Sequence, residues 1–294
     1  MVKCTVRVPA TTANLGPGFD SVGCAFTLYN TLTFTLCGDG LSFCKCNEKY
    51  ANENNLAFIG FKDVYTYLGK TGPCVNISFD EISVPVSRGL GSSAALIVAG
   101  AVAANHFLEN ALSKEEILKI CNKIEGHPDN LSPAIYGGLT ASLTEDAVPY
   151  SISYNIHPSL KFVALVPDFE LLTSVARSVL PKEVAFKEAV FNSSHLAVLL
   201  KALEEGNKKL ISIALNDKLH QPYRRGLING YDKAEELALG LGAVSFCLSG
   251  AGPTCLCITD NDDFADSMQK ALKENNLNWQ VLSLPVDNEG AKII

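Results

Sequence analysis

The segment PVSRGLGSSAA, from Pro85 to Ala95, places two glycines and two serines directly before a long apolar run. Glycine disfavours the middle of a helix and serine favours its first positions, so we expect a helix to begin here. The unpaired amides at a helix start carry a partial positive charge that suits a phosphate group. The segment lacks the lysine of a Walker A loop. From these residues alone, an anion-binding loop and an ordinary capped helix both remain open.

A second glycine-rich segment, PATTANLGPGFD, runs from Pro9 to Asp20 after a short strand pattern. Asn14 and Asp20 are polar side chains on a loop stiffened by glycine and proline. Loops held on a rigid scaffold commonly carry binding residues. The alternative is a surface turn in which both side chains cap backbone groups.

A third segment, SGAGPT from Ser249 to Thr254, lies between two apolar strand patterns and predicts a tight hairpin. Any function of Gly250 and Gly252 would be steric, because glycine lets backbone amides line a pocket.

The six residues EGHPDN, Glu125 to Asn130, crowd two carboxylates, an imidazole and an amide into one short stretch. Proline after His127 suits a type I turn, and Asp129 and Asn130 are ordinary turn residues. A turn and a catalytic cluster are therefore both open.

Arginines in two places could bind a carboxylate together, because the guanidinium fork binds a carboxylate through two hydrogen bonds. Arg177 lies one turn into a helix that is predicted to be capped by Thr173. Arg224 and Arg225 lie in the break HQPYRRG. Each arginine alone is equally typical of a solvated surface group.

The elements that must position these residues follow from apolar periodicity. Strands are predicted at residues 4–8, 28–36, 75–80, 161–166, 243–248, 254–259 and 279–284. Helices are predicted at 54–69, 92–108, 113–124, 231–241 and 262–275, with others starting at 173, 184 and 207. From residue 161 on, the predicted elements are a strand, several helices, two strands, a helix and a strand. This is the β-α-β-β-α-β order of a ferredoxin-like domain. The seam between two domains is expected near residue 157.

Composition narrows the class of protein. The chain has 294 residues, 47% of them hydrophobic, and a net charge of −7, which argues against a nucleic-acid partner. The ten cysteines lack C-x-x-C spacing and predict reduced thiols in a cytoplasmic protein. No signal peptide or ~20-residue apolar span is present, so no membrane association is expected.

Taken in order, these segments resemble the GHMP kinase superfamily. The blocks that carry the resemblance are VPATTANLGPGFDSVGCAF, PVSRGLGSSAALIVAG and SGAGPT. The first block, with EGHPDNLSPAIYGGL, PDFELLTSVARSVLP and HQPYRRGLI, is similar to the homoserine kinases within it. The resemblance implies an α+β fold of two domains. Residues 1–156 would form an ATP-binding domain like domain 2 of ribosomal protein S5, and residues 157–294 a ferredoxin-like domain.

The resemblance also implies an activity: phosphorylation of the side-chain hydroxyl of L-homoserine by ATP with Mg²⁺, in threonine biosynthesis. It implies a phosphate loop made of Pro85, Val86, Ser87, Arg88, Gly89, Leu90, Gly91, Ser92, Ser93, Ala94 and Ala95. It implies Mg²⁺ ligands at Ser92 or Ser93 and at Glu125. The homoserine-binding positions would be Asn14, Asp20, His127, Thr173, Arg177, Arg224 and Gly250.

Homoserine is a zwitterion, so Asp20 would bind its ammonium group, and Arg177 with Arg224 its carboxylate. Asn14 would orient the hydroxyl. Mevalonate kinases have an Asp where Asn130 stands, and an amide cannot accept a proton as a carboxylate does. We therefore expect no dedicated general base, with positioning supplying the catalysis and Asp129 as the rival base.

Two alternatives remain from the sequence. One is another GHMP small-molecule kinase acting on a mevalonate-type alcohol, which the amide at Asn130 disfavours. The other is a non-catalytic ligand-binding regulator of the same fold, which the intact glycine-serine loop and Glu125 disfavour. The resemblance also suggests a homodimer.

Overall fold

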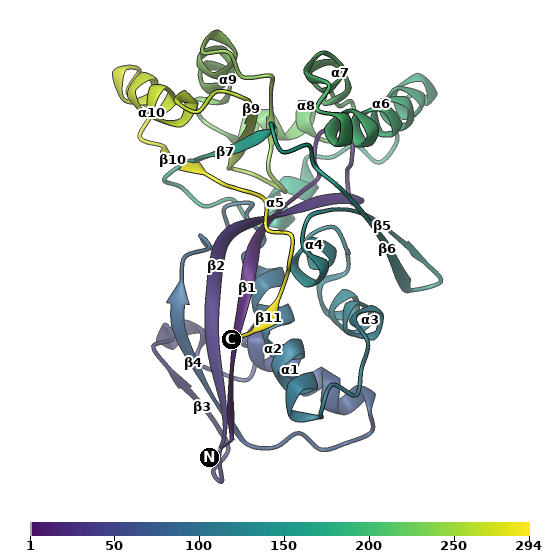
Figure 1. Cartoon of the computed structure of the whole chain (residues 1–294), viewed down its shortest axis with the longest axis vertical. Coiled ribbons are helices and arrows are strands. Elements are labelled where there is room, and N and C mark those ends of the chain that lie inside the picture. Colours follow the sequence, from purple (N-terminus) through teal and green to yellow (C-terminus); the bar gives the residue numbers. More distant parts are fainter. Residues whose placement is uncertain (1) are drawn as a thin grey trace.

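Two antiparallel-rich sheets form the framework of the protein, and the computed structural model describes residues 2–294 (Figure 1). The first sheet has seven strands, with the path β11-β1-β2-β4-β3; in addition, β5 pairs with β2, and β6 pairs with β5. Among residues 2–294, β3 and β4 are the one pair of strands that run parallel. Its strands are β1 (Lys3–Ala13), β2 (Val22–Leu36), β3 (Leu41–Cys44), β4 (Val75–Ile82), β5 (Leu139–Glu145), β6 (Val148–Tyr154) and β11 (Lys292–Ile293).

Four α-helices pack with this sheet around one apolar core. They are α1 (Leu56–Tyr67), α2 (Ser92–Phe107), α3 (Lys114–Glu125) and α4 (Leu131–Tyr136), preceded by the short 3-10 helix η1 (Glu48–Tyr50). The predicted capping box of Ser113 and Glu116 is present at the start of α3. Glycines let α1 and α2 approach closely, because a Cβ at Gly100 would lie 1.9 Å from the carbonyl oxygen of Ala57. Helix α2 is buried on most sides, as its apolar sequence predicts.

The second sheet has the strand order β10-β7-β9-β8, and every pair in it is antiparallel. Its strands are β7 (Lys161–Val166), β8 (Ser245–Leu248), β9 (Cys255–Thr259) and β10 (Gln280–Ser283). The accompanying helices are α5 (Thr173–Ser178), α6 (Phe186–Glu205), α7 (Lys208–Ala214), α8 (Gln221–Arg224), η2 (Arg225–Leu227), α9 (Tyr231–Gly240) and α10 (Phe264–Glu274). The predicted ferredoxin-like order of elements is confirmed.

The sequence patterns missed part of the first sheet. Strand β1 continues to Ala13, and β2 begins at Val22 instead of residue 28, because residues 10–13 pair with residues 23–26. The hairpin of β5 and β6 was not predicted. The chain end also returns from the second sheet, and Val6 and Arg7 of β1 pair with β11. The division into residues 1–156 and 157–294 stays a proposal, and the last strand belongs to the first sheet.

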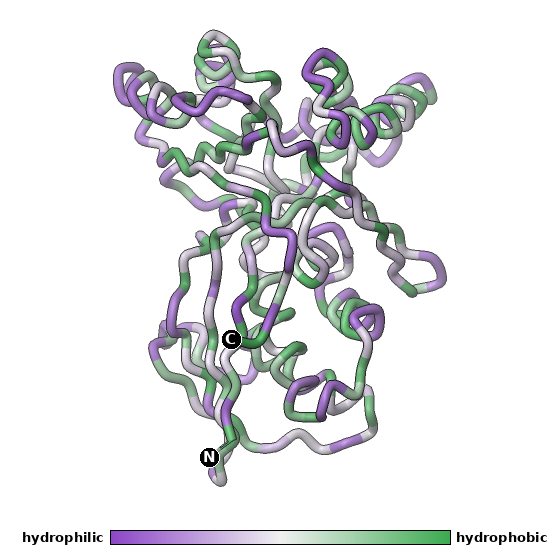
Figure 2. Tube along the Cα trace, viewed as in Figure 1, coloured by the Kyte–Doolittle hydropathy of each residue, from purple (hydrophilic) through white to green (hydrophobic). Residues whose placement is uncertain are grey.

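Hydrophilic residues gather on the outer turns of the helices beside the second sheet, and α2 is mostly hydrophobic (Figure 2). All ten cysteines are free thiols, as predicted. Within residues 2–294, every helix is too short or too polar to cross a membrane.

Candidate active site

A cavity of about 130 Å³, called the cleft below, lies where the glycine-rich segments of both halves meet. Most of the predicted site residues line it. The lining consists of Asn14, Ser87, Arg88, Gly89, Gly91, Ser92, Ser93, Glu125, His127, Asp129, Asn130, Leu171, Thr173, Arg177, Arg224, Gly250, Ala251 and Gly252.

Several residues of the predicted phosphate loop do not line the cleft. Leu90, Ala94 and Ala95 are fully buried in the apolar cores, and Pro85 and Val86 lie at the outer end of the loop. These five residues therefore form the framework of the loop and not its inner surface.

The two glycines of the loop are required by its shape. Gly89 and Gly91 have φ values of +76° and +70°, in the left-handed region. A Cβ at Gly89 would lie 2.3 Å from the carbonyl oxygen of Ser249, and one at Gly91 would lie 2.0 Å from Thr11 Oγ1. Gly91 is also the N-cap of α2, so the free amides of the first turn of the helix open toward the cleft.

The loop is clamped by the opposite half of the chain. Arg88 donates hydrogen bonds to the carbonyl oxygens of Phe169 (2.9 Å) and Asp168 (3.0 Å). The Ser249 hydroxyl donates to the carbonyl oxygen of Gly89 at 2.6 Å. The bonds from Arg88 fix the loop against the segment after β7, and the bond from Ser249 fixes it against the β8–β9 connection.

The β8–β9 connection is a hairpin, as predicted, but two of its amides are already used. Gly250 N–H donates to the Ala13 carbonyl, and Gly252 N–H donates to the Ser249 carbonyl, both at 2.9 Å. Both glycines line the cleft, as expected, but their N–H groups are not free to bind a ligand. Gly250 instead presents its carbonyl oxygen, which accepts a hydrogen bond from Arg224 at 3.3 Å.

Ser93 and Glu125 meet across the cleft, where the Ser93 hydroxyl donates to the Glu125 carboxylate. Both groups offer hard oxygen ligands of the kind that Mg²⁺ prefers. Across the described part of the chain, no group of three or more His, Cys, Asp or Glu residues forms a metal cage. This donor set suits a metal that also binds phosphate oxygens and water.

Hydrogen bonds fix the polar side chains of the turn after α3. Asn130 Oδ1 accepts a hydrogen bond from Thr11 Oγ1 at 2.8 Å, which leaves the amide nitrogen available as a donor. Asp129 is 2% exposed, and its Oδ1 accepts from His127 Nδ1 (3.1 Å) and from the backbone N–H of Asn130 (3.0 Å). The hydrogen bond to Asp129 raises the pKa of His127.

The first glycine-rich segment bends sharply at two non-glycine residues. Asn14 and Asp20 have φ values of +56° and +52°. The Asn14 side-chain oxygen accepts from the Asp20 amide at 2.8 Å, which locks the turn. Left-handed conformations at polar residues beside a cleft point to a functional role.

Arg177 and Asp20 bind each other in this structure. Two hydrogen bonds of 2.7 and 3.0 Å join the guanidinium to the carboxylate. Asp20 itself does not line the cleft, and it reaches the cleft through Arg177. The two groups were expected at opposite ends of a zwitterionic ligand, so a bound ligand would have to share or open this pair.

Arg224 is 1% exposed, which is rare for arginine. Its Nε donates to the Ala176 carbonyl oxygen at 3.1 Å, and Nη1 donates to Gly250. Burial, together with the nearby Arg177, lowers the pKa of Arg224 to about 10. In residues 2–294 no acceptor is bound to Nη2, so this nitrogen can donate to a ligand.

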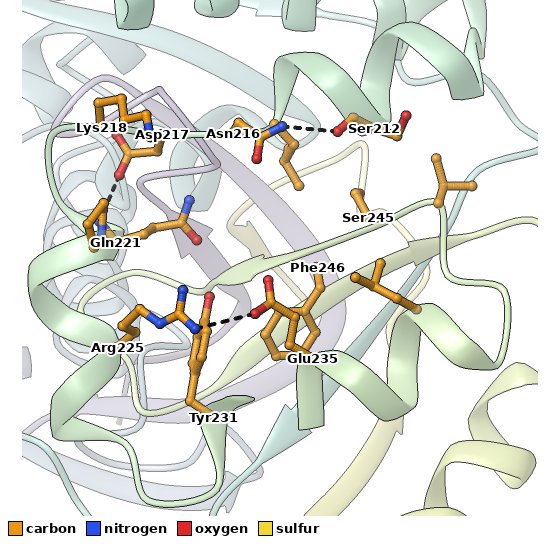
Figure 3. A pocket seen from close by; sticks show the side chains of 14 residues that line it. Ser212, Asn216, Asp217, Lys218, Gln221, Arg225, Tyr231, Glu235, Ser245 and Phe246 are labelled. Atoms are coloured by element: carbon orange, nitrogen blue, oxygen red, sulfur yellow. Dashed lines mark hydrogen bonds and ion pairs between the residues drawn. The ribbon is translucent and has the colours of Figure 1, made fainter. Parts of the chain in front are cut away.

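The neighbouring Arg225 points into a different cavity of about 400 Å³, shown in Figure 3. There it forms ion pairs with Asp232 and with Glu235 of α9. Adjacent residues of one short helical segment thus face two separate cavities, and only Arg224 lines the cleft.

Three residues that the sequence analysis did not select lie outside the cleft lining and support its arginines. Phe19 lies beside both cleft arginines, and His220 stacks on Phe19 with ring centroids 5.3 Å apart. Asp217 is buried and accepts hydrogen bonds from the amides of residues 219–221. The motif HQPYRRG contains His220, but the motif does not reveal that this histidine is buried and stacks on Phe19.

Comparison with known proteins agrees with this arrangement. The chain matches the models "GHMP kinases N terminal domain" over residues 56–138 and "GHMP kinases C terminal" over residues 199–277. It is 41% identical to a homoserine kinase of Clostridium beijerinckii over 99% of this chain and 98% of that protein. It is 42% identical to a homoserine kinase of Nostoc punctiforme over 98% and 97% of the two chains.

Solved structures show the same fold. The crystal structure of homoserine kinase from Cytophaga hutchinsonii matches with a TM-score of 0.89 and 27% identity, covering 99% of this chain and 97% of that chain. Mevalonate kinase of Methanococcus jannaschii shares the fold at a TM-score of 0.71 but only 16% identity, over 97% and 98% of the two chains. On the strength of these full-length matches, the chain belongs to the homoserine kinase family of the GHMP kinases.

Proposed function

We propose that this protein transfers the γ-phosphoryl group of ATP to the side-chain hydroxyl of L-homoserine, forming O-phospho-L-homoserine in threonine biosynthesis. The observation that carries the proposal is the composition of the cleft. The start of α2, which suits an anion, forms one wall, and two arginines form the other, one of them ion-paired with Asp20 outside the lining. Full-length relatives that are homoserine kinases support the same activity.

The nucleotide side of the cleft would use backbone groups more than charged side chains. The first-turn amides of α2, beginning at Ser92, have no intrahelical partners and suit phosphate oxygens. Ser93 and Glu125 would hold Mg²⁺, since a hydroxyl and one carboxylate leave the remaining positions to water and phosphate. When bound, Mg²⁺ neutralises charge that develops on the phosphates.

The acceptor side of the cleft would bind the two charged groups of an amino acid, its carboxylate and its ammonium. Arg224 offers Nη2 to the substrate carboxylate, and Arg177 adds a second guanidinium from α5. Asp20 would attract the ammonium group. The Asn14 amide nitrogen, with its oxygen held by the Asp20 backbone, would donate to the substrate hydroxyl and orient it. Thr173, Gly250 and His127 border the same space.

The chemical step would need no dedicated base. Asn130 has its amide oxygen bound to Thr11 and can only donate into the cleft. Oδ1 of Asp129 already accepts hydrogen bonds from His127 Nδ1 and from the backbone N–H of Asn130, so this oxygen is not free to take the hydroxyl proton. Phosphoryl transfer has a loose transition state, so positioning and electrostatic stabilisation can supply the rate, with the hydroxyl proton passing to a phosphate oxygen.

ADP release measured with separate acceptors tests the proposal. We expect release with L-homoserine and only background release with mevalonate, galactose or no acceptor. Nucleotide binding without turnover on any acceptor would favour the alternative of a non-catalytic, ligand-binding regulator. ADP release with mevalonate in preference to homoserine would favour a GHMP kinase that acts on a mevalonate-type alcohol.

We also infer a homodimer in the cytoplasm. Strand β6 supports self-association, because it pairs only with β5 and exposes Tyr150 (57%) and Ile152 (60%) without any charged residue in Val148–Tyr154. Light scattering should report a dimer for the natural chain and a monomer for Ile152→Lys. The ten free thiols fit a reducing compartment.

A further inference from the structure

We propose that Phe19 is a positioning residue that holds the guanidinium groups of Arg177 and Arg224 together so that both can receive one carboxylate. The inference rests on the proposed function and adds a specificity element to its acceptor site. Phe19 lies next to Asp20 in the sequence, yet its ring reaches the arginines of two distant helices, α5 and α8.

The distances place one aromatic ring beside two cations. The Cζ of Arg224 lies 5.1 Å from the centroid of the Phe19 ring, and the Cζ of Arg177 lies 5.6 Å from it. Both values fall within the range of cation–π attraction, which extends to about 6 Å. No other ring in the described residues contacts both cleft arginines in this way.

Two guanidinium groups near each other need such a partner. Each is positively charged, and the repulsion contributes to the lowered pKa of Arg224. Asp20 hydrogen-bonds to Arg177 and not to Arg224, and it acts on Arg224 only through space, as Asp129 and Asp217 do. The ring of Phe19 supplies a negative face to Arg224 without occupying its free Nη2. A carboxylate on the ring side would instead neutralise the arginine and compete with the substrate.

Contacts of the buried His220 hold Phe19 and Arg224 next to each other. His220 stacks on the Phe19 ring at an interplanar angle of 25°. Its Nε2 donates to the Gly16 carbonyl oxygen at 2.8 Å, so its Nδ1 is an acceptor and lies 3.5 Å from Arg224 Nη1. Burial lowers the pKa of His220, which favours this neutral form.

Asp217 completes the network from the other side. Its carboxylate accepts from the backbone amides of Leu219, His220 and Gln221 and thereby caps the start of α8, which carries Arg224. The Gly16–Asp20 turn and α8 are therefore fixed to each other through Phe19 and His220. This contact explains how residues more than 200 positions apart present one binding surface.

The test compares Phe19→Leu, which removes the π face, with Phe19→Tyr, which keeps it. We expect Phe19→Leu to raise the KM for homoserine about tenfold, a loss of about 1.4 kcal/mol of binding. The kcat and the KM for ATP should change less than about threefold. Phe19→Tyr should stay near the natural protein.

Two competitive inhibitors separate positioning from general packing. L-2-Aminobutyrate carries the ammonium and carboxylate groups, and 3-amino-1-propanol carries the ammonium and hydroxyl groups. Phe19→Leu should weaken inhibition by the first about tenfold and leave the second unchanged. An equal loss for both inhibitors, an equal loss in Phe19→Tyr, or no loss in Phe19→Leu would overturn the proposal.

Separate controls distinguish a variant that fails to fold from a failure of the proposed function. If Phe19→Leu is insoluble, Phe19→Met offers an unbranched aliphatic chain in its place and the same expectations hold. If the natural protein does not phosphorylate homoserine, the proposed function fails and this inference fails with it. If the natural protein is active and Phe19→Leu keeps its KM, only this inference fails.

Discussion

Arg177 and Asp20 stand 157 positions apart in the sequence and are joined by two hydrogen bonds, of 2.7 and 3.0 Å, in the cleft wall. The pair raises the pKa of Arg177, so its guanidinium stays charged. Because Asp20 has about a third of its side chain exposed, an incoming ammonium group can reach it. A zwitterionic ligand would therefore find both charges in place and would share or open the hydrogen bonds that join them.

Replacing Asp20 with Asn should weaken the binding of homoserine. The substitution removes the charge that would face the ammonium group, and a charge-assisted hydrogen bond contributes about 1.5–3 kcal/mol. We expect the KM for homoserine to rise about tenfold to a hundredfold, while the KM for ATP stays constant. Steady-state kinetics with each substrate varied in turn measures both. A rise in the KM for ATP of the same size would contradict the assignment.

Arg224 and Arg225 form a matched pair for mutation. Arg224→Ala should lower kcat/KM for homoserine about tenfold to a hundredfold, because it removes a hydrogen bond to the carboxylate. Arg225→Ala should keep kcat/KM within about twofold, since its exposed ion pairs contribute little. Equal losses in both variants would mean that the segment matters only as structure.

Gly91→Ala should abolish the binding of ATP. The new Cβ would lie 2.0 Å from Thr11 Oγ1 and 3.0 Å from Asn130 Oδ1, in a left-handed conformation that costs alanine about 1 kcal/mol before any clash. Gly38→Ala is the control, because a Cβ at Gly38 would meet nothing within 4 Å. Equilibrium binding of an ATP analogue reports the difference. Unchanged affinity in Gly91→Ala would remove the steric argument for the loop.

Asp129→Asn tests whether the reaction needs a base. With positioning as the main source of rate, the variant should retain measurable kcat. Loss of turnover with unchanged affinities for both substrates would make Asp129 the base.

The same variant carries a pH signature. The hydrogen bond with Asp129 raises the pKa of His127 above its unfolded value, so the pair stabilises the fold fully below about pH 6.5. This stability is lost as the pH rises through the folded pKa. Thermal unfolding should therefore separate the natural protein from Asp129→Asn more at about pH 6 than at about pH 9. An equal separation at both values would show that His127 does not titrate through this contact.

Glu125→Gln should raise the Mg²⁺ concentration needed for half-maximal activity, because an amide oxygen is a weaker ligand than a carboxylate. Glu115→Gln is a matched control on the same helix, since Glu115 is exposed and lies outside the cleft. Titration of activity with Mg²⁺ at saturating ATP distinguishes the two. An unchanged midpoint in Glu125→Gln would exclude Glu125 as a metal ligand.

The sequence predicted the second sheet because its strands alternate with helices in an order that few folds share. It missed β5 and β6, although both strands alternate apolar and polar residues, and it missed β11, which has only two residues. The residues of the cleft could be named from motifs. Their partners could not, because the contact of Phe19 with Arg224 and the ion pair of Asp20 depend on packing between distant segments.

The pairing of β11 with β1 joins the two ends of the chain. Val6 of β1 pairs with Ile293 of β11, so a segment that follows the second sheet covers one edge of the first. A contact between residues so far apart in sequence carries a large loop-closure entropy and is expected to form late in folding. Until it forms, that edge of β1 is open to pairing with another strand, so slow folding would expose the protein to edge-to-edge association.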